Sequence, residues 1–267
     1  MTPIALTIAG SDSGGGAGIQ ADLKAFSALG VYGASAVAAI TAQNTKGVTG
    51  VAEIAPDMVA AQIEAVLSDL AVGAVKIGML ASVPIVEAVA AALDDFEGPV
   101  VLDPVMVAKS GDALLKDDAV EALATRLVPR ARLVTPNLPE AARLLGRTEA
   151  RSEDEMLDQG EALLALGPGA VLMKGGHGGG ADCVDFLLDR GAPPLALRAP
   201  RLAAKNTHGT GCTLSSAVAA GLAKGLDLTQ ATGEAHAYLQ GALAAADGLT
   251  VGGGVGPVHH FHAMWDR

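Results

Sequence analysis

The sequence predicts an α/β fold in which helices cover both faces of a mostly parallel sheet. Short β-type runs alternate with amphipathic helical stretches along the chain, which is the rhythm of βαβ units. Half of the 267 residues are hydrophobic but only 3% are aromatic, so Val, Leu, Ile and Ala must fill the space between helices and sheet. Gly-rich turns at 10–18 and 175–180 follow two of the β-type runs, where open α/β sheets bind ligands.

Six apolar runs between turn residues are expected to be strands, and they are 4–9, 35–41, 74–77, 100–103, 133–135 and 171–174. A helix is expected over 57–70, because five apolar residues share one face and Pro56 and Asp57 mark its start. Those apolar residues are Met58, Ile63, Val66, Leu67 and Leu70. Crossover helices of this kind join parallel strands. Because no linker interrupts the pattern, residues 1–267 are expected to form a single domain.

The charge and cysteine content limit the classes of function. A net charge of -11 disfavours nucleic acid and anionic membrane surfaces as partners. An anionic nucleotide must then be held by local devices such as helix N-termini, glycine loops, single lysines and a metal. The two cysteines, Cys183 and Cys212, are too few for a disulfide framework. With an N-terminal run that lacks signal-peptide features, they predict a cytoplasmic protein.

The segment Gly209-Thr210-Gly211-Cys212 precedes a helix expected over 213–224. Its glycines allow close backbone approach, and free N–H groups at a helix start stabilise charge on a phosphoryl group. Cys212 would lie at the positive helix end, which lowers the pKa of a thiol and suits it to act as a base. The plainer interpretation is an ordinary helix start with an inert, buried cysteine.

Four other polar segments follow expected strands, and each has a plainer interpretation. The glycine-rich 10–22 segment places backbone near a ligand, but it matches neither a Rossmann nor a P-loop pattern. The carboxylate of Asp103 can help to bind magnesium, and the plainer interpretation is that Asp103 begins an Asp-Pro turn. Glu140 opens a helix after Asn137 and at least complements the helix dipole. Lys174 is suited to bind a phosphate, but a lysine at this position is equally typical of a solvated loop.

Taken in order, these segments resemble the hydroxymethylpyrimidine and phosphomethylpyrimidine kinases, a branch of the ribokinase superfamily close to the pyridoxal kinases. The matching segments are IAGSD (8–12), TAQNT (41–45), KIGML (76–80), DPVM (103–106), TPNLPE (135–140), KGGH (174–177), NTHGTGC (206–212) and the tail GPVHHFH (256–262). The resemblance spans nearly the whole chain. It implies a ribokinase-like three-layer α/β/α sandwich and an ATP- and Mg²⁺-dependent kinase of thiamine biosynthesis.

The resemblance also implies roles for individual residues. Gln43 would read the pyrimidine edge, in a pocket lined by Gly10, Asp22, Met79 and Cys212. Catalysis would fall to Gly209, Thr210 and Gly211 around the phosphoryl group, with Lys174 and with Cys212 in place of the usual base aspartate. ATP would contact Asn137, Lys174, Thr207, Gly209 and Gly211, and Asp103 with Glu140 would position Mg²⁺. Relatives imply a homodimer.

The same resemblance implies a second phosphorylation, from the monophosphate to the pyrophosphate, for which Lys109 or His208 would supply extra donors. Three alternatives stay open at this point. A pyridoxal kinase, or an enzyme taking both substrates, would use the same site. A Cys-dependent acyl transferase or hydrolase would pair Cys212 with His208. A non-catalytic pyrimidine-binding protein would keep the fold and leave ATP unconsumed.

Overall fold

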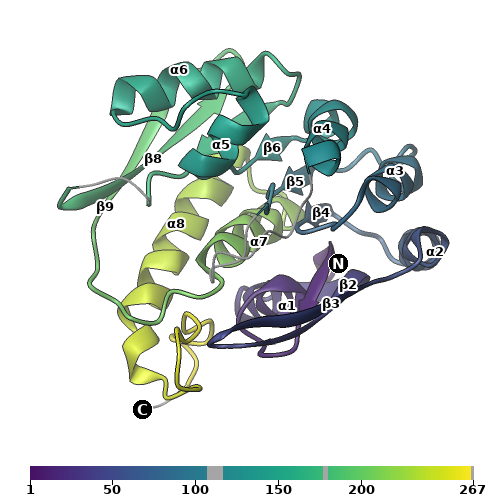
Figure 1. The fold of residues 1–267 in the computed structure, drawn as a ribbon, viewed down its shortest axis with the longest axis horizontal. Coiled ribbons are helices and arrows are strands. Elements are labelled where there is room, and N and C mark those ends of the chain that lie inside the picture. The colour runs from purple at the N-terminus through teal and green to yellow at the C-terminus, as the bar shows by residue number, and fades with distance from the viewer. Residues whose placement is uncertain (107–116, 177–179, 266–267) are drawn as a thin grey trace.

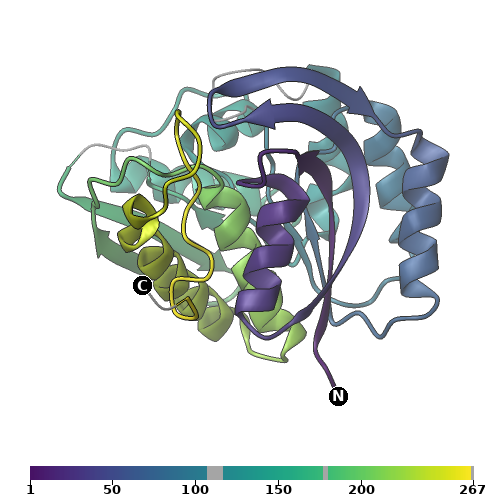
Figure 2. The same cartoon turned by 90° about the horizontal axis from the view of Figure 1, so that it is seen from below.

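One nine-stranded sheet with helices on both faces forms the molecule (Figures 1 and 2), as seen in a computed structural model that describes residues 1–106, 117–176 and 180–265. The strand order is β3-β2-β1-β4-β5-β6-β7-β8-β9. The predicted three-layer α/β/α sandwich with a mostly parallel sheet is therefore confirmed.

Six neighbouring strands run parallel, namely β1 (Ile4–Asp12), β2 (Tyr32–Asn44), β4 (Ala74–Ile77), β5 (Val100–Leu102), β6 (Leu133–Val134) and β7 (Ala170–Met173). They correspond to the six predicted runs. The other three pair antiparallel at the sheet edges, and they are β3 (Gly47–Glu53), β8 (Asp182–Asp189) and β9 (Leu195–Pro200). These three strands were not predicted from the sequence.

The two faces of the sheet carry different helices. One face packs on α2 (Pro56–Leu67), α3 (Val83–Ala92), α4 (Asp117–Arg126), α5 (Leu138–Leu145) and α6 (Glu153–Leu164). The other packs on α1 (Gly18–Ala28), α7 (Thr210–Ala223) and α8 (Leu228–Ala244). Successive side chains of β1 point to opposite faces of the sheet. Leu6 and Ile8 therefore pack in the hydrophobic core on the first face, and Ala5 packs in the core on the second. Short 3₁₀ turns occupy Val128–Arg130 and Ala246–Gly248.

The predicted helix over 57–70 exists as α2, but it ends at Leu67, so Leu70 lies beyond it, and Met58 is wrongly placed on its apolar face. Val59 and Ile63 are buried against the sheet, whereas Met58 is 55% exposed. Val59, Ile63, Val66 and Leu67 follow the i, i+4, i+7, i+8 spacing of one helix face, and Met58 lies off that face. Val66 and Leu67 still pack against the core, as predicted.

Helix α7 is the element that positions the site. Its residues are almost all small, and Thr213 to Gly221 are buried between the sheet and α8. A Cβ on Gly221 would come within 2.8 Å of the Ala231 Cβ, so the small residues permit the close approach of α7 to α8. The helix lies against β1, β4 and β5 in the middle of the molecule (Figure 1). Within the described residues, no helix is both long and apolar enough to cross a bilayer.

Candidate active site

The predicted site residues gather where the parallel strands end and α7 begins. Gly10 and Gln43 lie in the last parts of β1 and β2. Asp103 and Lys174 directly follow β5 and β7, and Met79 lies two residues beyond β4. Because parallel strands end on the same edge of a sheet, one edge brings together residues that are far apart in sequence.

The first turn of α7 contains Thr210, Gly211 and Cys212, so the helix starts three residues earlier than predicted. Gly209 precedes it with φ 81°, in the left-handed region that favours glycine. Thr210 Oγ1 donates to the Thr207 carbonyl at 2.6 Å and fixes the approach to the turn. The N–H groups of a first helical turn have no partner within the helix, so this end of α7 can bind an anion.

Replacing Gly209 with Ala is expected to destabilise the fold by at least about 2 kcal/mol, because a left-handed residue would gain a Cβ. That Cβ would overlap the carbonyl oxygen of Gly16 in the loop that α7 packs against. Gly225→Ala is the matched control, since Gly225 has φ 86° and an added Cβ meets nothing within 4 Å. Urea denaturation gives the free energy of unfolding of both variants. Equal losses of stability would contradict the role of the contact with Gly16.

Lys174 joins two carboxylates beside the start of α7. Its Nζ lies 2.8 Å from Asp103 Oδ1 and 3.8 Å from Glu140 Oε2. Thr135 Oγ1 and Ser215 Oγ donate to Asp103 at 3.1 and 3.3 Å. A Cβ on Gly211 would stand 3.4 Å from Lys174 Nζ and 3.6 Å from Asp103 Oδ2, so the helix backbone directly faces the cluster.

Burial and charge act in opposite directions on this cluster. Burial would lower the pKa of Lys174, but Asp103 and Glu140 outweigh it and raise the pKa above its usual value. Burial would raise the pKa of Asp103, but Lys174 and Lys76 hold it below its usual range. For Glu140 burial dominates and raises the pKa to about 7, with Lys174 opposing the shift.

Glu140 and Asn137 form a capping box at the start of α5. Asn137 Oδ1 accepts from the Glu140 N–H and Glu140 Oε2 accepts from the Asn137 N–H, both at 2.8 Å. An isolated bridge pairs Asn137 with Lys174, which holds α5 beside the end of β7. The predicted ATP-binding Asn137 therefore lies in the same cluster as Lys174, with its side-chain oxygen used as a cap.

The predicted magnesium ligands are near each other but do not form a complete cage. Within 1–106, 117–176 and 180–265, no group of three His, Cys, Asp or Glu side chains could hold a metal by itself. Mg²⁺ is usually held by one or two carboxylates together with substrate phosphates. Asp103 and Glu140 supply only oxygen donors and both contact the same ammonium, so this donor set fits Mg²⁺ bound together with a phosphate.

Gly10 and Met79, two residues of the predicted substrate pocket, lie against each other. The Gly10 N–H donates to the Met79 carbonyl at 3.1 Å, and a Cβ on Gly10 would stand 2.6 Å from Met79 Cε. Gly18, with φ 56°, packs on the Gly10 carbonyl, and its N–H donates to Cys212. The predicted pocket residues Gly10, Met79 and Cys212 are thus brought together around Gly18.

The expectation that the helix start lowers the pKa of Cys212 is wrong. The side chain keeps some exposure, but surrounding protein desolvates the thiol and raises its pKa to about 11. Asp22 and Asp103 add to the increase, whereas Lys76 and the Gly18 N–H oppose it. The thiol is therefore protonated at neutral pH.

Asp22, another residue of the predicted substrate pocket, is fully buried. Its carboxylate forms an ion pair with Lys76 at 2.8 Å and accepts from Thr7 Oγ1 and Ser216 Oγ, both at 2.6 Å. Thr7 and Lys76 point from β1 and β4 toward α1 and α7, on the face opposite the Leu6 and Ile8 side chains. The arrangement links the sheet to both helices, and any contact of Asp22 with substrate stays a prediction.

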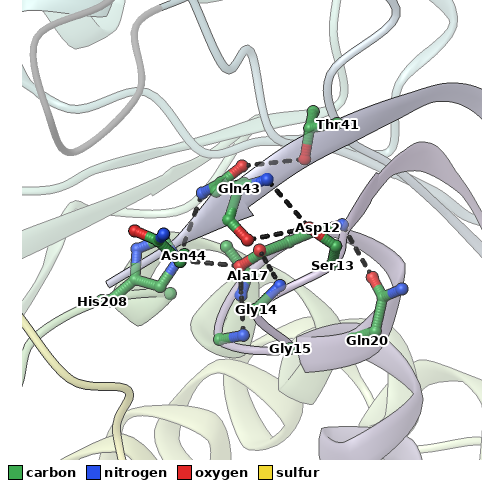
Figure 3. A network of polar contacts seen from close by, with 12 residues as sticks. Asp12, Ser13, Gly14, Gly15, Ala17, Gln20, Thr41, Gln43, Asn44 and His208 are labelled. Atoms are coloured by element: carbon green, nitrogen blue, oxygen red, sulfur yellow. Dashed lines mark hydrogen bonds and ion pairs between the residues drawn. The ribbon is translucent and has the colours of Figure 1, made fainter. Parts of the chain in front are cut away.

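Figure 3 shows a network around Asp12 that was not predicted from the sequence. Its carboxylate accepts from the N–H groups of Gly14, Gly16 and Ala17 at 2.8, 3.1 and 2.9 Å, and His208 Nε2 lies 2.8 Å from Oδ2. Burial would raise the pKa of Asp12, but these hydrogen bonds hold it below its usual value. The pair joins residues 196 positions apart, so no local pattern could reveal it.

The network ties the glycine-rich loop to the turn before α7. His208 exchanges backbone hydrogen bonds with Gly256 and Val258, so a segment near the C-terminus supports the same turn. A small pocket outside His208 is lined by Gln43, Asn44, Thr45, Lys46, Gly47, His208 and Val255. Another hollow, around Pro3 and Lys224, lies at the opposite end of α7, away from these groups. The predicted donor Lys109 and the motif residue His177 lie outside the described residues.

Known proteins resemble the chain along its full length. The family described as Phosphomethylpyrimidine kinase matches residues 12–259. A Rhizobium meliloti hydroxymethylpyrimidine/phosphomethylpyrimidine kinase is 58% identical and is covered over 99% of both chains. The ADP complex of Bacillus subtilis pyridoxal kinase superposes with a TM-score of 0.91 at 36% identity over 100% of both chains. The structure of the Clostridium difficile phosphomethylpyrimidine kinase superposes with a TM-score of 0.78 at 45% identity, over 89% of this chain and 97% of that one. The chain belongs to the phosphomethylpyrimidine kinase family.

Proposed function

We propose that the chain is an ATP-dependent kinase that phosphorylates 4-amino-5-hydroxymethyl-2-methylpyrimidine and then its monophosphate to the pyrophosphate, in thiamine biosynthesis. The observation that supports it most is the position of the α7 start. Its Gly211 faces Lys174 and Asp103, and its Cys212 lies by Gly18, which packs on Gly10 of the predicted substrate pocket. An anion-binding helix end between a cation and an organic pocket is the arrangement that phosphoryl transfer requires. The names of the similar kinases supply the pyrimidine substrate.

In the proposed reaction the substrate hydroxymethyl oxygen bonds to the γ-phosphorus of ATP, the bond to the leaving ADP oxygen breaks, and the hydroxyl proton is released. The first-turn N–H groups of α7 stabilise the transferring phosphoryl oxygens, and Lys174 balances their charge. Mg²⁺, positioned by Asp103 and Glu140, would neutralise phosphate charge when bound. Because Cys212 is protonated at neutral pH, it orients the hydroxyl as a hydrogen-bonding partner, and a loose transition state needs little help from a base.

Three further statements belong to the same proposal. Residues 1–267 act as one kinase domain, since a single sheet includes every strand of the described residues. The enzyme works in the cytoplasm, where ATP is available. It forms a homodimer, which sedimentation would test directly.

Binding of Mg²⁺ and ATP is expected to release protons at pH 6. Glu140 has a pKa of about 7 and is mostly protonated at that pH, and a cation beside it favours the ionised form. The release should fade above pH 8, where Glu140 is already ionised. Calorimetry in buffers of different ionisation enthalpy measures it. Glu140→Gln keeps a capping side chain and should reduce the release, whereas equal release from both proteins would contradict the assignment.

The direct test of function is product analysis by mass spectrometry after incubation with hydroxymethylpyrimidine, ATP and Mg²⁺. Monophosphate followed by pyrophosphate is the expected result. Pyridoxal should be tested in the same assay, because the 0.91 TM-score to a pyridoxal kinase favours it as a second substrate. Formation of pyridoxal phosphate alone would overturn the pyrimidine assignment. The hydrolase alternative gains no support, since among the described residues His208 Nε2 contacts Asp12 and Gln43 and makes no hydrogen bond to Cys212.

A further inference from the structure

Asp185 on β8 is a buried carboxylate to which the proposed reaction gives no part. Its side chain is only 9% exposed, and its Oδ1 accepts from the Gly175 N–H at 2.8 Å. Acidic side chains are rarely buried unless a polar or charged partner accompanies them. Here the partner is the residue directly after Lys174, which connects the carboxylate to the active site.

The hydrogen bond lies where the pairing of β7 with β8 ends. The last pair is Met173 with Phe186, and two residues further on Gly175 lies against Val184. A Cβ on Gly175 would stand 2.0 Å from the Val184 carbonyl oxygen, so the two backbones are in direct contact. The Asp185 side chain accepts the N–H at this contact and thereby fixes the peptide that joins Lys174 to Gly175.

Both peptides that flank Lys174 are therefore held. The Lys174 N–H donates to the Pro136 carbonyl at 2.9 Å, and the next N–H along the chain donates to Asp185. These two bonds set the direction in which the Lys174 side chain leaves the backbone, while Asp103 holds its Nζ. Because a lysine side chain has many rotamers, a backbone free to turn would let the ammonium leave this position.

Lys174 and Asp185 also lie on the same face of the sheet. Leu172 and Leu187 pack in the core beside α7 and α8, and side chains two residues apart in a strand share a face. Lys174 and Asp185 are each two residues from one of these leucines. Burial raises the pKa of the Asp185 carboxyl, whereas the neighbouring backbone N–H, His236 on α8 and Lys174 oppose the shift. The carboxylate is thus close to the ammonium as well as bonded to the turn behind it.

From these contacts we infer that Asp185 is a positioning residue, which holds the peptide after Lys174 so that the ammonium stays beside Asp103 and the start of α7. Asp185 acts through Lys174 and takes no part in the chemical step. The inference rests on the proposed function for its consequence, because the loss in rate assumes that Lys174 stabilises the transferring phosphoryl group.

Kinetics of two variants at the same position test the hydrogen bond. Asp185→Leu removes the acceptor, and kcat should fall roughly tenfold to a hundredfold, as when a catalytic group is displaced by about 1 Å. The KM for hydroxymethylpyrimidine should stay close to wild type, since the predicted pyrimidine contacts come from other strands. Asp185→Asn keeps an oxygen acceptor of the same shape and should keep most of the wild-type kcat.

Asp189→Leu is the matched control. Asp189 belongs to the same strand, but it pairs with Arg132 at the other end of the β7–β8 pairing, and its loss should leave kcat unchanged. A wild-type kcat in Asp185→Leu would overturn the inference. Equal losses in Asp185→Leu and Asp185→Asn would also overturn it, because the charge and not the hydrogen bond would then be what matters.

A double-mutant cycle tests whether the effect passes through Lys174. In a Lys174→Met background, Asp185→Leu should lower kcat no further, because the group that it positions is already absent. Additive losses would show that Asp185 affects the reaction by another route and would overturn the inference.

The hold on Lys174 can also be measured without any substrate. Brief labelling with acetic anhydride, followed by peptide mass spectrometry, gives the reactivity of each lysine. Asp185→Leu should raise the labelling of Lys174 severalfold relative to the exposed Lys46, because an ammonium that leaves its ion pair reaches solvent and loses its proton more readily. Asp185→Asn should label as the wild type does.

Lys76 is the internal control of the labelling experiment, since it is fully buried and should stay unreactive in every variant. Unchanged labelling of Lys174 in Asp185→Leu would overturn the inference, and so would labelling of Lys76 together with Lys174, which would show general unfolding. If the wild-type enzyme does not phosphorylate the pyrimidine, the proposed function fails, and the labelling still decides whether Asp185 holds Lys174.

Discussion

Lys174→Met is expected to lower kcat by about a hundredfold to a thousandfold, the range seen when a fixed group that stabilises a transition state is removed. The ammonium lies 2.8 Å from Asp103 and faces the Gly211 backbone, so no other described side chain is placed to take over its charge. The change also removes the cation that holds the pKa of Asp103 low and opposes the increase at Glu140. Both carboxylates then bind protons more tightly, which weakens them as magnesium ligands.

Steady-state kinetics at saturating ATP measure the effect, with circular dichroism to confirm that the variant folds. Lys224→Met is the matched control, because Lys224 is an exposed lysine at the opposite end of α7. Its kcat should equal that of the wild type. A Lys174→Met enzyme with nearly normal kcat would contradict the role of Lys174 in phosphoryl transfer.

Lys76→Met is expected to cost about 3–5 kcal/mol of unfolding free energy, the usual effect of removing one partner from a buried ion pair. Lys76 and Asp22 are both fully buried, 2.8 Å apart, so the variant leaves the Asp22 carboxylate without a counter-charge inside the protein. Thr7 and Ser216 continue to donate to it and offset only part of the loss. The pKa of Cys212 should also rise, since Lys76 lowers it, and alkylation of the thiol should slow.

Urea denaturation gives the free energy, and the exposed pair Arg147–Asp158 provides a control. Arg147→Met should leave stability almost unchanged, because solvent screens such pairs. Adding Asp22→Asn to Lys76→Met should recover part of the loss by removing the isolated charge. If Lys76→Met were as stable as Arg147→Met, the buried pair would not hold the sheet to α1 and α7.

The parallel strands were predictable because each is a short apolar run bounded by turn residues. Two of the three antiparallel strands, β3 and β9, were missed for a physical reason, whereas β8 lies between β7 and β9 and is largely buried. β3 is exposed along most of its length and includes two glycines, so it lacks the apolar periodicity of a core strand. β9 is also largely exposed. Strands at the edge of a sheet depend on pairing with a neighbour, which the local sequence does not encode.

The family resemblance identified site residues that the fold brings together, but it did not predict the pKa values of their side chains. Cys212 shows the limit most clearly, because its position at a helix start predicts a lowered pKa whereas its surroundings raise it to about 11. Asp12 and His208 both lie in segments that carry the family resemblance. Their contact was not predictable, because the two residues are 196 positions apart in the sequence. Local sequence predicts the start of a helix, whereas the dielectric environment and long-range partners come from the complete fold.

The support of the His208 turn by residues 256–258 affects when the enzyme becomes competent during its synthesis. A nascent chain that has emerged only as far as β9 can pair all nine strands, but it lacks α7 and the backbone partners of His208. The glycine-rich loop, made among the first twenty residues, must therefore wait for its partner until most of the protein has left the ribosome. Catalytic activity should appear as one of the last events of biosynthesis, after the sheet has formed.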